Sequence, residues 1–257
     1  MPRVTYEGYG EMSDVCIKRK IRNRLLDAGE NIFVQSDDKN TDGYKSLKAR
    51  AEANEAFGAE LKNGKKADAQ RGYEIACKEW MDVRSFGQVF AFKGSDLSLG
   101  IRGPVSVQPA FSVDPIDITS MQITKSVNSE DKEGKSSDTM GMKHRVDFGV
   151  YILKGSINVQ LSEKTGFTEE DAEKIKEAIR TLFVNDSSSA RPDGSMVMHK
   201  LYWWKHNCKI GQYSSHKVHN SIEIKKKEGV RNPRKIEDYE IICHELPGLA
   251  VEEYEGL

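Results

Sequence analysis

The irregular order of helical and strand-like segments constrains the fold of this chain more than any other feature of the sequence. The clearest helical segment begins at Thr168, where three acidic residues follow, and apolar side chains recur at helical spacing up to Phe183. Strand-like apolar runs occur at positions 83–92, 101–107, 116–127, 146–153, 156–161, 196–204, 222–224 and 239–243. Since helices and strands do not alternate regularly, as they would around a parallel sheet, the sequence predicts an α+β fold.

A second helix is predicted near the N-terminus, at positions 13–26. Ser13 or Asp14 can cap its first turn, and Gly29 is placed to end it. Every fourth residue is a large aliphatic one, which predicts a buried stripe made of Ile17, Ile21 and Leu25.

Two polar segments are predicted to lie outside the core. Positions 37–72 are rich in alanine, lysine and glutamate and hold few large apolar residues, which predicts an insertion of exposed short helices and loops. A helix is expected to follow at 73–81. Positions 128–138 are too polar to be buried, and they resemble the tip of a long hairpin whose return arm begins near Thr139.

Charge and cysteine usage narrow the class of protein. The net charge is -1, so no overall basic field indicates a nucleic-acid partner, although five of the seven residues from Lys18 to Arg24 are basic. The four cysteines are far apart, which favours reduced thiols over a disulfide framework. No signal peptide or membrane-spanning stretch is visible, so a soluble, cytoplasmic protein is predicted.

No motif in the sequence selects an enzyme class. A phosphate-binding glycine loop, a nucleophile elbow and a zinc-protease helix are all missing from it. Several potential metal ligands lie close together in sequence, but their spacing fits no familiar zinc pattern, and surface or strand histidines are the simpler interpretation: His199, His206, Cys208, His216 and His219.

The basic helix at 13–26 is the best candidate for a binding surface. Like charges four residues apart, as in Lys18 with Arg22, destabilise an isolated helix by a few tenths of a kcal/mol. A bound polyanion would turn this cost into phosphate neutralisation and counterion release. An ordinary solvated basic face is an equally good interpretation from composition alone.

Three further segments combine cations with hydrogen-bonding side chains. The first, 84–88, is predicted at the start of a strand, with Phe86 as core or as a platform for a base. The second, 140–145, places three potential cations beside a glycine, and the third is the serine-rich loop 187–192. Such loops can hold phosphates or sugars, although a plain polar loop is the commoner case.

Several segments together resemble one known family over nearly the whole chain. It is the major, multi-copy backbone subunit of the type I-C CRISPR Cascade complex, of the RAMP superfamily. The matching segments are SDVCIKRKIRN at 13–23, DVRSFG at 82–87, RGPV at 102–105, FSVDP at 111–115, TMGMKH at 139–144, SEKTGF at 162–167 and DSSSAR at 186–191.

The resemblance implies a single domain over 1–257 built on a modified RNA-recognition-motif (RRM, ferredoxin-like) palm. It implies a helical fingers insertion at 29–72 and a β-hairpin thumb at 116–145. Copies of such subunits stack head to tail along a CRISPR guide RNA (crRNA), and heterologous association of this kind can extend as a filament. Base pairing with target DNA then reads the sequence, while the protein grips the backbone.

The resemblance also implies which residues contact the guide. By position in the matching segments, the RNA-binding residues are Lys18, Arg19, Lys20, Arg22, Asn23, Arg84, Ser85, Gln88, Lys143, His144, Ser188, Ser189 and Arg191. The expected partners are crRNA, target DNA through the crRNA, further copies of the chain and other Cascade subunits. No cofactor, metal ligand or catalytic residue is expected.

The sequence departs from the family's pattern at its start. Members normally begin with another apolar strand and a loop rich in glycine, asparagine and proline, ahead of the position of Met1. The first palm strand is therefore expected to be missing, which would leave an unpaired sheet edge. A mis-assigned or shortened N-terminus is favoured over a reduced variant.

Two other functions stay open at this stage. A metal-independent endoribonuclease that processes the guide precursor would use a histidine of such a fold, with His144 as the candidate general base. A metal-binding protein would use the histidines of the C-terminal third.

Overall fold

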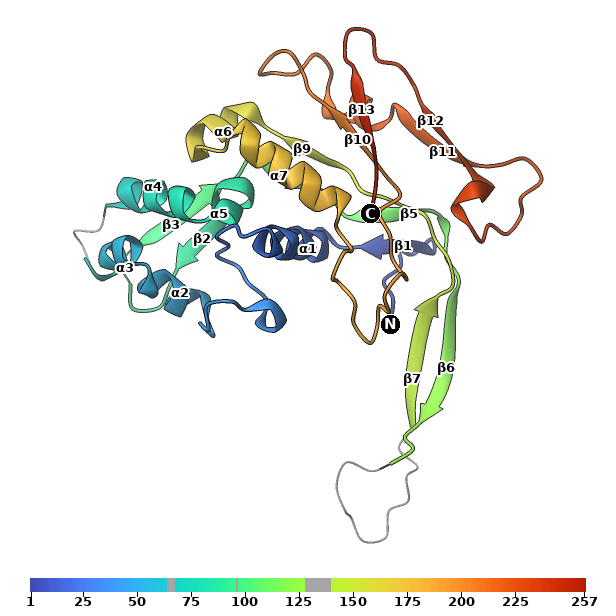
Figure 1. Cartoon of the computed structure of the whole chain (residues 1–257), viewed down its shortest axis with the longest axis horizontal. Helices are drawn as coiled ribbons and strands as arrows, with labels where there is room; N and C mark the ends of the chain where they lie inside the picture. The colour runs from blue at the N-terminus through green and yellow to red at the C-terminus, as the bar shows by residue number, and fades with distance from the viewer. Residues whose placement is uncertain (64–67, 96, 128–139) are drawn as a thin grey trace. The chain divides into compact units, whose positions relative to one another are not determined.

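The computed structural model describes residues 1–63, 68–95, 97–127 and 140–257 (Figure 1). The described residues combine helices with small antiparallel sheets, which confirms the α+β prediction. They form two compact units. The helical unit comprises Asp14–Gln108, Gly155–His219 and Glu245–Leu257, and the hairpin unit comprises Met1–Ser13, Pro109–Lys154 and Asn220–His244.

The helical unit holds the described α-helices and three two-stranded antiparallel sheets, β2 with β3, β4 with β9 and β10 with β13. In chain order its elements are α1 (Asp14–Asp27), η1 (Asp37–Lys39), α2 (Leu47–Ala53), α3 (Glu55–Lys62), α4 (Ala69–Glu79), α5 (Met81–Phe86), β2 (Gly87–Ala91), β3 (Ser98–Arg102), β4 (Val105–Val107), β9 (Gly155–Ile157), α6 (Val159–Thr165), α7 (Glu169–Arg180), β10 (Lys200–Trp204), α8 (Ser215–His219) and β13 (Val251–Glu255).

Sequence periodicity located the two longest helices of this unit correctly. The predicted stripe of α1 is buried, with Ile17, Ile21 and Leu25 each at most 1% exposed. At α7, the Thr168 hydroxyl accepts a hydrogen bond from the backbone N–H of Asp171, and the Asp171 carboxylate accepts one from the N–H of Thr168. This reciprocal capping box satisfies two backbone donors that the helix itself cannot pair.

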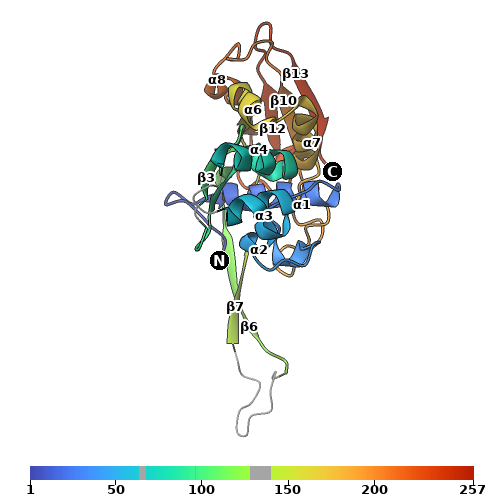
Figure 2. The same ribbon diagram turned by 90° about the vertical axis from the view of Figure 1, so that its left-hand side faces the viewer.

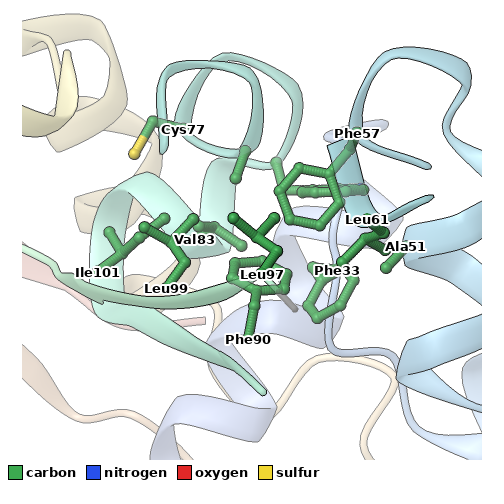
Figure 3. Close-up of a cluster of buried hydrophobic side chains, with 12 residues drawn as sticks. Phe33, Ala51, Phe57, Leu61, Cys77, Val83, Phe90, Leu97, Leu99 and Ile101 are labelled. Atoms are coloured by element: carbon green, nitrogen blue, oxygen red, sulfur yellow. The ribbon is translucent and has the colours of Figure 1, made fainter. Parts of the chain in front are cut away.

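The core of the helical unit includes part of 37–72, which was predicted to lie outside the core, although the short helices predicted there are present. Phe57 of α3 and Phe33 are fully buried and lie against Phe90 of β2 and Trp80, with ring centroids 4.7–5.4 Å apart for the closest pairs (Figure 3). Of the few large apolar residues in the segment, Phe57 and Leu61 are buried in this cluster and Leu47 packs against it, whereas Tyr44 is exposed. Because an aromatic ring buries a large area, Phe57 contributes much of the anchoring of α3.

The strand predicted at 83–92 begins only at Gly87. Residues 83–86 belong to α5, a short helix that buries Met81, Asp82, Val83 and Ser85. Gly87 ends the helix with a φ of +82°, and a Cβ there would lie 2.3 Å from the carbonyl oxygen of Ile101. Glycine is required both for the left-handed backbone and for the close approach of β3. Arg84 and Ser85 are therefore helical residues, and the prediction that they start a strand is wrong.

The strand predicted at 156–161 is half helix, because its last three residues belong to α6. β9 ends at Ile157, and α6 begins at Val159 after the Asn158 side chain has accepted a hydrogen bond from the N–H of Leu161. Gly166 ends α6 in the left-handed conformation. The short apolar run resembled a strand because a helix of seven residues shows hardly two turns of periodicity.

The hairpin unit is built from three antiparallel groups of strands, β1–β5–β8, β6–β7 and β11–β12. Its elements are β1 (Tyr9–Met12), β5 (Ala110–Pro115), β6 (Ile118–Thr124), β7 (Met140–Val146), β8 (Tyr151–Ile152), β11 (Ile222–Lys226), η3 (Ile236–Asp238) and β12 (Tyr239–Cys243). Sequence analysis had identified neither β1 nor β5 as a strand, whereas β12 matches its predicted range.

The long hairpin of this unit pairs β6 with β7 from Ile118 opposite Val146 to Thr124 opposite Met140 (Figure 2). The predicted tip of the hairpin, 128–138, and its predicted return point, Thr139, lie outside the described residues.

Candidate nucleic-acid interface

Helix α1 presents two of its predicted RNA-binding cations at the surface. Lys18 and Arg19 are partly exposed, and Lys18 Nζ lies 3.1 Å from a carboxylate oxygen of Asp14, one turn earlier. A surface pair of this kind contributes little to stability, and it is screened by salt. Within the described residues Arg19 forms no ion pair. Lys18 and Arg19 can therefore bind a phosphate without losing a strong interaction within the protein.

Arg22 of the same helix is held by a buried carboxylate. Its Nε donates to Asp82 at 2.8 Å, and its guanidinium lies 5.0 Å from the centre of the Phe86 ring. Asp82 is fully buried and also accepts hydrogen bonds from the backbone N–H groups of Phe33 and Val34. Arg22 therefore compensates the buried charge of Asp82, and Asp82 in turn fixes the chain that follows α1. This role of Arg22 is structural.

Lys20 joins α1 to Asp186, the residue that precedes the serine-rich loop 187–192. It is only 2% exposed, its ammonium contacts the Asp186 carboxylate, and it lies 5.4 Å from the centre of the Phe183 ring. Burial lowers the pKa of Lys20 to about 8, and the nearby Arg191 adds to this effect. The contact with Asp186 opposes both influences because an adjacent carboxylate favours the charged amine.

Arg191 shares the Asp186 carboxylate and closes the loop. Its Nε lies 3.4 Å from that carboxylate, and Ser188 and Arg191 exchange backbone hydrogen bonds of 2.8 and 3.0 Å. The buried Nε forms no hydrogen bond with any residue in the described part of the chain. Ser188 and Ser189 are exposed beside it. The loop thus presents hydroxyl groups and a guanidinium that keeps donors for an anion.

Arg84 points from α5 to the first turn of α7. It makes a bidentate ion pair with Asp171, with N–O distances of 3.0 and 2.7 Å. Burial opposes the charged form of Asp171, but the hydrogen bonds from Arg84 and Thr168 outweigh it and hold the pKa of this carboxyl below its ordinary value. The pair joins two helices, so Arg84 is also committed within the protein.

The remaining predicted residues of the helical unit are mostly turned inward. Ser85 is fully buried and donates to the carbonyl oxygen of Met81, while Asn23 is buried and accepts from Ser36. Gln88 is partly exposed and donates to the carbonyl oxygen of Val89. Direct contact of Ser85 or Asn23 with RNA would require their neighbours to move.

Lys143 and His144 lie on β7 of the hairpin unit. Lys143 is exposed opposite Met121, and His144 faces the other side of the hairpin, where its Nδ1 lies 2.8 Å from the hydroxyl of Ser120. A hydroxyl neighbour orients the imidazole, but it supplies none of the charge of a carboxylate partner.

Comparisons with known proteins identify the family. The family model described as "CRISPR-associated protein Cas7" matches residues 1–244. This chain belongs to the Cas7 family. Among solved structures, it is similar to a chain of a "CRISPR RNA-guided surveillance complex, pre-nicking", with 16% sequence identity and a TM-score of 0.44, over 74% of this chain and 67% of that chain. No curated protein matches the chain.

Sequence reasoning missed the carboxylates that organise the basic residues of this Cas7 chain. Asp82, Asp171 and Asp186 bind Arg22, Arg84 and Lys20, their partners being 60, 87 and 166 residues away in sequence. No local pattern marks such pairs. Asp82 and Asp186 lie within segments that resemble the family, and that resemblance could have drawn attention to them. Asp171 lies outside those segments and was marked only as one of the acidic residues that follow Thr168.

Two further properties of the Cas7 chain concern the described residues alone. No group of three or more His, Cys, Asp or Glu side chains is arranged there to hold a metal ion. No helix among them combines the length and the apolar character that crossing a bilayer requires.

Proposed function

We propose that this Cas7-family chain is the crRNA-binding backbone subunit of a type I-C surveillance (Cascade) complex, and that it serves as a binding protein rather than an enzyme. The family match over residues 1–244 carries this proposal. Copies would stack head to tail along the guide, together with other Cascade subunits, and leave the guide bases free to pair with target DNA. Sequence reading by base pairing requires the protein to hold only backbone and shape.

The proposed subunit has an RRM-like palm, fingers at 29–72 and a thumb at 116–145. The paired strands β6 and β7, which run from Ile118 to Val146, support the thumb. The helices α2 and α3 and the start of α4, all of them inside or at the edge of 29–72, support helical fingers.

The cations available to a guide differ in the proposed surface. Lys18, Arg19 and Arg191 are partly exposed, and their only ion pairs with described residues are those of Lys18 with Asp14 and of Arg191 with Asp186. Arg22 and Arg84 are bound by the buried carboxylates of Asp82 and Asp171, and Lys20 is itself buried against Asp186. The first three residues would contact the phosphates of the guide. The last three would hold the elements that carry those contacts in place. Contacts to phosphate oxygens are independent of base identity, as a subunit that accepts many guides requires.

The test of this proposal is a double substitution on α1, Lys18→Ala with Arg19→Ala. Arg22→Ala is a poorer choice because it would leave Asp82 buried without its cation. Alanine favours the helix, so the variant should fold. We expect roughly tenfold weaker binding to every guide sequence at moderate salt, and a slope of log K against log salt reduced by about 1.4, for two phosphate contacts with single-stranded RNA.

The matched control is Lys62→Ala with Lys78→Ala, which removes the same charge from two exposed positions of the helical unit. Binding is measured by fluorescence anisotropy with several labelled guides at several salt concentrations. A double α1 variant that bound all guides like the parent would show that α1 does not hold the guide.

Head-to-tail assembly has a separate expected result. The purified chain should form large particles with guide RNA, and their mass should rise in steps as the guide is lengthened, because each copy covers a fixed length of backbone. Light scattering after size exclusion measures this mass. One copy per guide at every length would rule out the filament.

A further inference from the structure

The last two residues of β11 and the loop that follows them carry the strongest local charge that the proposed guide surface does not use. Of the eleven residues from Lys225 to Lys235, six are basic and only Glu228 is acidic. All six basic side chains are exposed. The loop extends past the ends of the two strands (Figure 1). It belongs to the hairpin unit, whereas α1 belongs to the helical unit.

Asp238 holds the two ends of this basic loop by hydrogen bonds to its backbone. Asp238 accepts hydrogen bonds from the N–H groups of Arg234 and Lys235 at 2.7 and 3.2 Å, and its carbonyl accepts one from Lys227 at 2.9 Å. The bond from Arg234, with that from Lys235, lowers the pKa of Asp238 below its ordinary value, so the carboxylate stays charged. An ordered backbone presents the cations at low entropic cost.

Two of the six cations form ion pairs with carboxylates that the structure describes. Lys225 pairs with Glu223 at 2.9 Å and Lys226 with Asp114 at 3.1 Å, and both lysines belong to β11. The other four form no ion pair with any carboxylate that the structure describes: Lys227, Arg231, Arg234 and Lys235. An array of unpaired like charges is unfavourable by itself, and a polyanion would relieve the repulsion.

The composition of the loop favours nucleic acid over a protein partner. Its two apolar members, Val230 and Pro233, are half-buried, and it holds no aromatic residue. Protein interfaces are instead centred on buried aromatic or apolar anchors. The acidic strand β13 of a second copy is a weak match because Glu252 is already paired with Lys176, and Glu253 with Lys200. Without aromatic side chains the loop cannot stack bases, so it would recognise phosphates alone.

We propose that the basic loop, residues 225–235, is a second nucleic-acid-binding surface that holds a sugar-phosphate backbone independently of sequence. This surface is distinct from the proposed guide contacts of α1, because its residues belong to the hairpin unit and those of α1 to the helical unit. Its ligand is a run of phosphodiester groups, from either a DNA strand or a further stretch of RNA. Up to four phosphates can be neutralised by the unpaired side chains.

The test is the triple variant Arg231→Gln, Arg234→Gln and Lys235→Gln in the full chain. The Asp238 carboxylate bonds the backbone N–H groups of Arg234 and Lys235, which the substitutions leave in place, so the loop should keep its shape. The control variant Lys62→Gln, Lys78→Gln and Lys164→Gln removes the same charge from exposed positions of the helical unit. Probes are labelled random-sequence single-stranded RNA, single-stranded DNA and duplex DNA, offered to the chain with and without bound guide RNA.

We expect the loop variant to bind at least one probe about tenfold more weakly than the control does, with a salt slope lower by about 2 for single strands. Loss confined to the DNA probes identifies DNA as the ligand, and loss confined to RNA identifies RNA. Equal affinities and slopes for the loop variant, the control and the parent would overturn the assignment. Equal weakening of the loop and control variants would do the same, since it reflects net charge only.

The α1 variant separates this inference from the proposed function. If Lys18→Ala with Arg19→Ala leaves guide binding intact while the loop variant loses a probe, the guide surface is wrongly placed and the loop stands. If only the α1 variant weakens binding, the guide surface is supported and the basic loop is not a nucleic-acid-binding surface.

Discussion

Replacing Asp82 by alanine should lower the free energy of unfolding of the helical unit by about 3–5 kcal/mol, as is typical when one partner of a buried ion pair is removed. Asp82 is 0% exposed and accepts hydrogen bonds from Arg22, Phe33 and Val34 at 2.7–3.0 Å. Its loss leaves a largely buried guanidinium without a counter-charge and the buried N–H of Phe33 without an acceptor. An unsatisfied buried donor alone costs about 1–3 kcal/mol.

Urea denaturation followed by tryptophan fluorescence measures this effect in the appropriate part of the chain. All three tryptophans, Trp80, Trp203 and Trp204, belong to the helical unit, so the signal does not depend on two-state unfolding of the whole chain. Asp27→Ala is the matched control: Asp27 pairs with Arg24 and Lys39 at the exposed end of α1, and the loss of such surface pairs should cost about 1 kcal/mol or less. Equal midpoints for the two variants would contradict the role assigned to Asp82.

Local sequence signals predicted those elements whose stability is local. The stripe of α1 follows from apolar residues four apart, and the cap of α7 from Thr168 followed by acidic residues, because both depend on neighbours within one or two turns. The same signals failed for α5. Its four residues 83–86 look like part of a strand until Gly87, whose positive φ and contact with β3 are settled only by packing.

In the candidate site, too, local sequence predicted which residues share a helix but not which of them are exposed. Sequence placed the basic residues of α1 on one helix, but it could not separate the partly exposed Lys18 from the buried Lys20 two positions later. That difference depends on Asp186 and Phe183, which reach α1 through tertiary structure. The basic composition of a helix therefore overstates the charge that it offers to a ligand, because part of that charge neutralises carboxylates of the protein itself.

For the basic loop of the hairpin unit, sequence analysis underestimated the charge that is available to a ligand. Its six cations were overlooked because they lie between two weak strands and outside every segment that resembles the family. The structure makes them conspicuous since four of them lack ion pairs with the described carboxylates. Resemblance to a family directs attention to the residues that the family shares. Cations outside those residues are recognised only when the structure shows which of them lack a carboxylate partner among the described residues.

Phe57→Ala should lower the free energy of unfolding of the helical unit by about 3–5 kcal/mol, the range observed when a buried phenylalanine is truncated. The Phe57 ring is 0% exposed and lies edge-on to Trp80 at 5.4 Å and tilted against Phe90 at 4.8 Å (Figure 3). Its removal leaves a cavity between α3 and the aromatic cluster, which rigid neighbours cannot fill.

Phe57→Leu serves as the graded control, because it keeps an apolar side chain in the site and should cost about half as much. Both variants keep all three tryptophans, so urea denaturation can be followed by their fluorescence. Had 37–72 been the exposed insertion that its polar composition suggests, neither substitution would change the midpoint. A loss that scales with the volume removed, in contrast, requires α3 to be part of the core, since only a packed interior penalises a missing ring in proportion to the space it leaves.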